Sequence, residues 1–295
     1  MTPINSRKVA RIAVAAIVLS GLIVAALGPQ RVVKTAAWHL RRGWLILSGR
    51  LIDVGGYRLR VERRGNGSPT VVMDAGLCQV MKTWDRVVPE IAKFVQVVVY
   101  DRAGLGGSDP GPRPRTSQQN VNELHALLNN AGVAGPYVLV GHSFGGLNVR
   151  LFASQYPAEV AGVVLIDASY EEQYLRFADI KSAEERKRYL RHESGDNCEK
   201  VNLIASGDLV HTARSLPLVP VVVLTADPYH SKGKTIDAML GQLQMEMQSR
   251  LAAVVSKGKQ TIVTGSGHFI QLDQPEVVID SILTIVKAAR NRASM

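Results

Sequence analysis

A serine between two glycines is the first feature of this sequence that could carry out chemistry. Residues 141–145 read Gly-His-Ser-Phe-Gly, after a β-branched run at 138–140 and before a helix-like segment. This pattern is typical of a nucleophile elbow, a strained strand-to-helix turn that projects a serine hydroxyl and requires glycine neighbours. The same five-residue pattern also arises by chance, so the other candidate residues decide whether Ser143 is a nucleophile.

A serine hydroxyl attacks well only when a general base removes its proton. His268 follows a short strand expected at 260–264, in the turn Gly265-Ser266-Gly267-His268. Two carboxylates could orient such a base. Asp167 ends the strand expected at 160–167, and Asp227 closely follows the strand expected at 219–224. The chain therefore carries candidate groups in the order serine, aspartate, histidine.

The elements that must position these groups read as strands that are apolar on both faces, alternating with helices. A hairpin around Gly55-Gly56 precedes them. Strands buried on both faces predict an α/β fold with a mostly parallel sheet covered by helices. Ligands bind such a sheet beyond the carboxyl ends of its strands. The residues expected there are Gly76, Leu77, Asp101, Ser143, Asp167, Asp227 and His268.

Three motifs make residues 49–287 resemble the α/β-hydrolase fold superfamily, in its serine esterase, lipase and haloperoxidase-like branch. They are Gly141-His-Ser-Phe-Gly-Gly146, Asp101-Arg-Ala-Gly-Leu-Gly-Gly-Ser-Asp109, and Ser266-Gly-His-Phe269 before Asp273-Gln-Pro275. The resemblance implies a central, mostly parallel sheet with helices on both faces. It also places a short cap at about 170–215.

The resemblance assigns Ser143 as the nucleophile and His268 as the base and acid. Many family members carry the orienting acid just after the strand at 219–224, which slightly favours Asp227 over Asp167. However, Thr225-Ala226 replaces the usual glycine-containing turn before Asp227. Both aspartates remain candidates. We expect Asp101 and Asp109 to stabilise their loop through Arg102.

The resemblance also implies an oxyanion hole formed by two backbone N–H groups, those of Phe144 and Leu77, beside Gly76. Ala75 stands where the family commonly has histidine. Because the donor at this position belongs to the main chain, the substitution leaves the expected site intact. His142 is expected to be structural or pocket-lining.

These residues predict a serine hydrolase that cleaves an ester or related acyl bond of a small-molecule substrate through an acyl-enzyme. Acyltransferase, amidase and haloperoxidase-like activities would use the same three groups and stay open. A ligand-binding module without turnover is a further alternative. The chemistry needs no metal and no organic cofactor. Dehalogenase and epoxide hydrolase relatives need an aspartate at the position of Ser143.

The formal net charge of +10 is concentrated at the N-terminus. Residues 1–64 hold twelve Lys and Arg against Asp53 and Glu62, which leaves 23 basic and 23 acidic residues in the remainder. The excess therefore flanks an apolar run and does not cover the domain. We expect no nucleic-acid partner and favour a membrane surface as the partner of this charge.

The apolar run itself, residues 12–30, is uncharged and long enough for a helix to span a bilayer core. We expect residues 1–30 to be a single-pass signal anchor, or alternatively a cleaved signal peptide for export, in a bacterial-type cell membrane. Residues 31–49 would be a basic juxtamembrane segment, and 50–291 the hydrolase domain. Basic residues on both sides leave the orientation open. The two cysteines are expected to be ordinary thiols.

Overall fold

A single eight-stranded sheet runs through the computed structural model, which describes residues 49–213, 216–227, 238–254 and 259–293. The strand order is β1-β2-β4-β3-β5-β6-β7-β8. Their bounds are β1 Arg50–Asp53, β2 Arg58–Arg64, β3 Thr70–Asp74, β4 Val97–Tyr100, β5 Tyr137–His142, β6 Val160–Ile166, β7 Val221–Ala226 and β8 Lys259–Val263.

The predicted hairpin is confirmed at one edge of this sheet. β1 pairs antiparallel with β2, and β2 pairs antiparallel with β4, whereas all later pairings are parallel. Gly55 and Gly56, both with positive φ, form the turn, and the Asp53 carboxylate accepts their N–H groups. The mostly parallel sheet is therefore as the sequence predicts.

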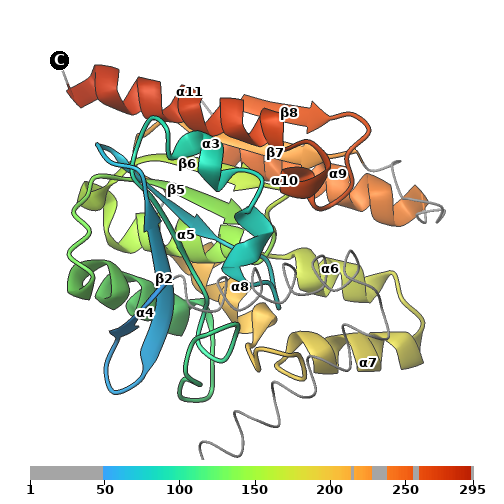
Figure 1. Cartoon of the computed structure of the whole chain (residues 1–295). Coiled ribbons are helices and arrows are strands. Elements are labelled where there is room, and N and C mark those ends of the chain that lie inside the picture. Colours follow the sequence, from blue (N-terminus) through green and yellow to red (C-terminus); the bar gives the residue numbers. More distant parts are fainter. Residues whose placement is uncertain (1–48, 214–215, 228–237, 255–258, 294–295) are drawn as a thin grey trace, which may run out of the picture. The chain divides into compact units, whose positions relative to one another are not determined.

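Helices cover both faces of the sheet (Figure 1), and side chains of the strands β3 to β7 alternate between two cores. In β5, Leu139 packs into the core beneath α4 and α5, while Val138 and Val140 pack into the core beneath α3 and α11. The helices outside the cap are η1 Met81–Trp84, α3 Val88–Ile91, α4 Ser117–Asn130, α5 Gly145–Gln155, η2 Pro157–Glu159, α9 Ala238–Val254, α10 Ile270–Asp273 and α11 Pro275–Ala293.

Two elements differ from what their sequence patterns predict. The apolar run at 94–100 predicts a buried strand, but β4 begins only at Val97, and Phe94 is 57% exposed. The helix-period segment at 84–91 predicts one helix, but the structure divides it into η1 and α3. Pro89 lies in the first turn of α3, where a missing N–H and a fixed φ are tolerated, so it marks a new helix start.

The expected cap corresponds to three helices between β6 and β7, namely α6 Gln173–Asp179, α7 Ala183–Glu193 and α8 Leu203–Thr212. Ser182 and Glu185 form a capping box at the start of α7, and Asn202 caps α8. The charged run 181–188 predicts a solvated helix face, and residues 182–188 are exposed while Lys181 is half-buried. In contrast, α8 buries Leu203 and Val210.

The cysteine prediction was wrong. Cys78 and Cys198 form a disulfide whose Cα atoms are 5.9 Å apart. The bond joins the loop after β3 to the segment between α7 and α8. Because the two residues are 120 positions apart, no local spacing pattern indicates the pairing.

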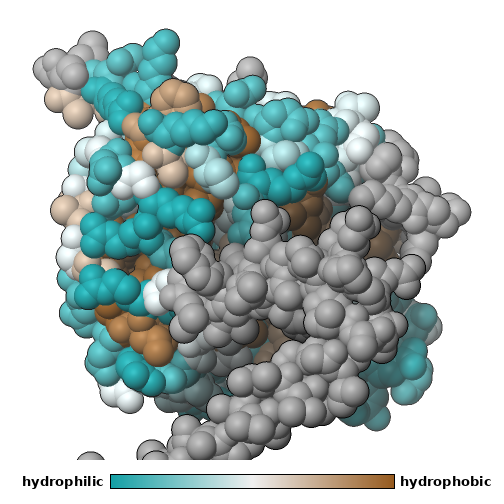
Figure 2. All heavy atoms as spheres, in the orientation of Figure 1, coloured by the Kyte–Doolittle hydropathy of each residue, from teal (hydrophilic) through white to brown (hydrophobic). Residues whose placement is uncertain are grey.

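Residues 50–295 form one compact unit. Figure 2 shows mostly hydrophilic side chains on the described part of one face, with hydrophobic ones in small areas between them. The N-terminal span predicted at 12–30 and the juxtamembrane segment predicted at 31–49, except Gly49, lie outside the described residues. Within the described ranges, no helix has both the length and the apolar character needed to cross a bilayer.

Candidate active site

Ser143 occupies the turn between β5 and α5 with a backbone φ of +50°. Its N–H donates to Ile166 O, and its carbonyl accepts from Gly146 N and Ser169 N, which fixes this strained residue on both sides. A non-glycine residue at positive φ costs free energy and persists only when its surroundings hold it. The expected elbow is therefore present, with the serine at the carboxyl end of a central strand.

The flanking glycines are required by close packing. A Cβ at Gly141 would lie 2.7 Å from both Gly145 O and a Val149 methyl group, and a Cβ at Gly145 would collide with the carbonyl oxygen of Asp74. Glycine at both positions lets α5 start directly against the ends of β3 and β5. The Gly-x-Ser-x-Gly spacing follows from this contact.

The structure pairs His268 with Asp167. His268 Nδ1 lies 2.6 Å from Asp167 Oδ2, and the Asp167 carboxylate also accepts the Ala226 N–H at 3.1 Å. Asp167 directly follows β6, whose last residue Ile166 is in register with His142, so it lies one strand from Ser143. Its side chain is only 4% exposed, whereas that of His268 is 46% exposed.

Asp227, the other candidate acid, lies one strand further on. Its Oδ2 accepts the Gly265 N–H at 3.0 Å, and its own N–H donates to Ser266 O. These bonds connect the end of β7 to the loop that carries His268. Asp227 is thus hydrogen-bonded to the backbone of the histidine loop, whereas Asp167 is hydrogen-bonded to the imidazole of His268.

His142 is fully buried next to the serine. Its Nε2 lies 2.8 Å from the carbonyl oxygen of His268, its Nδ1 lies 3.0 Å from Gln79 Oε1, and its ring centroid lies 4.7 Å from that of His268. Burial, and then the proximity of His268, lowers the pKa of His142 to about 3. Neutral His142 therefore donates to the main chain of the histidine loop and holds it.

The two expected oxyanion donors lie at the ends of neighbouring strands. Phe144 immediately precedes α5, and Leu77 follows Gly76 in the loop after β3, which we call the oxyanion loop (residues 75–79). Among the described residues, neither the Phe144 N–H nor the Leu77 N–H donates to another backbone carbonyl. Neither N–H is therefore used by the described backbone, although Phe144 itself is fully buried.

The role expected for Arg102 differs in the structure. Asp109 pairs with Arg58, and Asp101 accepts from Met81 N and Gly107 N. These two aspartates do stabilise their loops. Arg102 contributes only its carbonyl, which accepts the Leu105 N–H, and not its side chain. Its guanidinium is buried and points to the oxyanion loop and to Glu199 of the cap segment. The sequence carried no signal for Glu199, because its partner lies 97 residues away.

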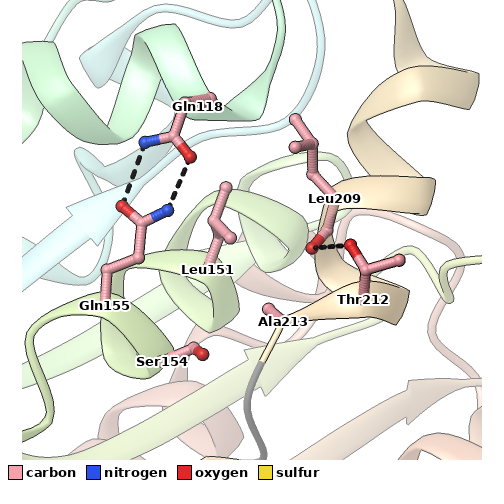
Figure 3. A pocket seen from close by; sticks show the side chains of 7 residues that line it. All are labelled: Gln118, Leu151, Ser154, Gln155, Leu209, Thr212 and Ala213. Carbon is pink, nitrogen blue, oxygen red and sulfur yellow. Dashed lines mark hydrogen bonds between the residues drawn. The ribbon is translucent and has the colours of Figure 1, made fainter.

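A cavity of about 460 Å³ lies away from these residues, between α4, α5 and α8 (Figure 3). At one side of it, Gln118 and Gln155 exchange hydrogen bonds of 3.0 and 2.6 Å through their amides. None of the candidate site residues lines it, so it is not part of the candidate active site. Its lining comprises Gln118, Leu151, Ser154, Gln155, Leu209, Thr212 and Ala213.

No group of three or more His, Cys, Asp or Glu side chains that could hold a metal ion occurs within the described ranges.

Residues 69–228, more than half of the chain, match the family model described as alpha/beta hydrolase fold, and the chain belongs to this family. This confirms the resemblance that the three motifs indicate. The match includes the elbow, the oxyanion loop, Asp167 and Asp227, and ends before His268.

Several known proteins are similar to this chain over part of its length. A probable transporter of Hormonema carpetanum is 34% identical over 43% of the chain and 19% of the relative. The lipase LipV of Mycobacterium tuberculosis is 37% identical over 37% of the chain and 41% of the relative. The chain thus spans less than half the length of the curated relatives it matches first.

Among solved structures, a thermophilic esterase from Thermogutta terrifontis aligns with a TM-score of 0.59 at 20% identity, over 82% of this chain and 99% of the esterase. At this identity the similarity shows the shared fold alone.

The buried His142 makes stability depend on pH. An unfolded histidine has a pKa near 6.5, so below that pH the unfolded chain binds a proton that folded His142 does not bind until about pH 3. This contribution to stability is complete above pH 6.5 and is lost as the pH falls. Between pH 7 and pH 5, the wild-type protein should lose about 2 kcal/mol more unfolding free energy than His142→Gln.

Urea unfolding of both proteins at the two pH values measures this difference, and the variant cancels the contributions of all other groups. Equal losses in the two proteins would show that His142 is protonated in the folded state.

Proposed function

We propose that this protein is a serine hydrolase that cleaves an ester or related acyl bond of a small molecule through an acyl-enzyme. The observation that carries the proposal is the hydrogen bond between His268 Nδ1 and Asp167 beside the strained elbow serine. Asp167 would hold the imidazole with Nε2 directed to the reaction and would stabilise the imidazolium. We therefore assign Asp167, and not Asp227, as the orienting acid.

In the first step, the Ser143 oxygen attacks the carbonyl carbon of the substrate, and His268 Nε2 takes the hydroxyl proton. The carbonyl π electrons move to oxygen, and the N–H groups of Phe144 and Leu77 bind the resulting oxyanion. Collapse breaks the bond to the leaving group, which receives the proton from His268. Water then attacks the acyl carbon while His268 takes one of its protons. Collapse breaks the bond to the Ser143 oxygen, which receives that proton from His268, and the acid product leaves.

Exposed apolar surface beside the base supports a substrate with an apolar portion. Phe269 is 43% exposed, with its ring centroid 5.3 Å from that of His268, and Leu272 of α10 is 38% exposed. Such side chains next to a polar reacting centre are typical of sites that bind apolar acyl or alcohol groups.

We expect a fluorophosphonate probe to label the native protein at Ser143. Labelling should disappear in Ser143→Ala and fall at least about 100-fold in His268→Ala, because the base no longer activates the hydroxyl. Ser154→Ala, on the helix that follows the elbow, is the matched control and should label like the wild type. Gel fluorescence and mass spectrometry of the labelled peptide provide the readout. A folded native protein that stays unlabelled contradicts the proposal.

Separate Asp→Asn changes test the choice of acid. Asp167→Asn should lower kcat for a small chromogenic ester by about 10³–10⁴, since the imidazole then loses its orientation and charge partner. Asp227→Asn changes the carboxylate that binds the Gly265 N–H and leaves the Asp167–His268 bond in place, so its loss in kcat should stay below about tenfold. The reverse ranking would assign the acid to Asp227, and two small losses would contradict a triad.

We further propose that residues 12–30 anchor the hydrolase domain to a membrane, with the domain on the oxidising side. Two observations support this location. The run is uncharged and follows Arg7, Lys8 and Arg11, and the Cys78–Cys198 disulfide is a bond that persists in exported domains and is rare in the reducing cytosol. The disulfide thus favours one of the two orientations that the basic flanks leave open.

The anchor predicts that the full-length protein pellets with bacterial membranes through a carbonate wash, and that protease added to intact spheroplasts digests the domain. A variant lacking residues 12–30 should stay in the soluble fraction with the disulfide unformed, as free-thiol alkylation would show. Full-length protein with an intact N-terminus in the supernatant alone would contradict the anchor. Protection from protease would contradict the orientation.

A further inference from the structure

A buried charge cluster lies directly beneath the oxyanion loop. Arg102, Asp74 and Glu199 have side chains that are 2%, 1% and 1% exposed. Arg102 binds Glu199 in a bidentate pair, with Nε to Oε2 at 2.8 Å and Nη2 to Oε1 at 2.6 Å. Burial alone would lower the pKa of Arg102, but the two carboxylates raise it above its ordinary value, so it stays charged.

The same guanidinium binds the backbone of the oxyanion loop. Nη1 donates to Ala75 O at 2.6 Å, and Nη2 donates to Gly76 O at 2.7 Å. Its carbon also lies 5.3 Å from the centroid of the Phe144 ring, within the range of a cation–π contact. Arg102 therefore contacts the residues on which both expected oxyanion donors depend.

The Gly76 carbonyl belongs to the same peptide unit as the Leu77 N–H. The cis peptide bonds of the described residues lie elsewhere, so this unit is trans and planar. In such a unit the C=O and N–H bonds point in opposite directions, so holding the Gly76 oxygen in place also sets the direction of the Leu77 N–H. A cation on the carbonyl also polarises the unit and makes the N–H a stronger donor, as in chains of hydrogen bonds.

Glu199 fixes the next peptide unit. Its Oε1 accepts the Cys78 N–H at 2.6 Å in addition to the Arg102 bond. Leu77 is consequently held on both sides, by Arg102 through the preceding peptide and by Glu199 through the following one. Cys78 itself has a φ of +63° and is covalently bound to Cys198, the residue before Glu199.

We propose that Glu199, together with Arg102 and the Cys78–Cys198 disulfide, positions the Leu77 N–H as an oxyanion donor, so that the cap segment completes the active site. This inference rests on the proposed function, because it assigns how one part of that site is built. Glu199 and Arg102 are positioning residues. They act on the reaction only through the backbone of the oxyanion loop.

Loss of a correctly directed oxyanion donor raises the barrier of the chemical step and leaves ground-state binding largely unchanged. Glu199→Ala should therefore lower kcat for a small ester by about 10–100-fold, with KM within about threefold of the wild type. Glu199→Gln keeps an acceptor for the Cys78 N–H and loses the charge that holds Arg102. Its kcat should therefore lie between that of the wild type and that of Glu199→Ala. Cys78→Ala/Cys198→Ala should lower kcat in the same direction.

Amide hydrogen exchange measured by mass spectrometry supplies a readout independent of turnover. Exchange of peptides that cover residues 75–79 should accelerate in the Glu199 and cysteine variants, because the oxyanion loop opens more often. The matched control is Glu123→Gln, which alters another buried arginine–glutamate pair, with Arg115 at 2.8 Å. It should leave kcat and the exchange of residues 75–79 unchanged.

The outcomes separate this inference from the proposed function. If the wild type reacts with the fluorophosphonate probe but Glu199→Ala keeps kcat within about threefold, the positioning role is wrong and the hydrolase proposal stands. Equal losses in Glu199→Gln and Glu123→Gln would also overturn it, since general destabilisation would then explain both. An unlabelled wild type would overturn the proposed function and this inference together.

Discussion

The close approach of α5 to the ends of β3 and β5 is the contact on which the candidate site depends. It exists only because residues 141 and 145 have no side chains, and it forces Ser143 into a left-handed backbone conformation. A free chain would relax from this conformation, so the hydrogen bonds to Ile166 and Ser169 must hold it. The strain at the serine is thus sustained by the packing of three strands and one helix.

The parallel register determines which groups meet at this point. Since β5 and β6 are adjacent and their last residues pair, the residues that follow them lie side by side. Ser143 and Asp167 both occupy such positions, and both have positive φ. The histidine comes from beyond the last strand of the sheet and reaches Asp167 across β7. The site is assembled from strand ends that are far apart in the sequence.

Much of this arrangement could be predicted from the sequence. Apolar runs and the glycine turns predict the strands and the mostly parallel sheet, because burial on both faces leaves a strong pattern. The ambiguity between Asp167 and Asp227 could not be resolved in this way. Asp167 directly follows β6 and Asp227 directly follows β7. The distance from each carboxylate to His268 depends on how the histidine loop folds back over the sheet.

The buried polar groups beneath the site were the least predictable part. Arg102 and Glu199 carry no local signal, and their pairing depends on contacts across 97 residues. The hydrophilic composition of the segment between α7 and α8 predicts an exposed connection. However, Asn197 and Glu199 are only 4% and 5% exposed when the backbone and side chain of each residue are counted together. Polar residues in the interior become recognisable only when their hydrogen-bond partners are known.

The disulfide and Glu199 make the cap an integral part of the domain. An insertion that only connects two strands could be exchanged for another without affecting the sheet. Here the segment carrying Cys198 and Glu199 supplies a covalent bond and a carboxylate to the loop after β3. A transplanted cap that lacked this pair would leave Arg102 in the interior with one fewer carboxylate. The cap and the sheet of this domain must therefore be engineered as one unit.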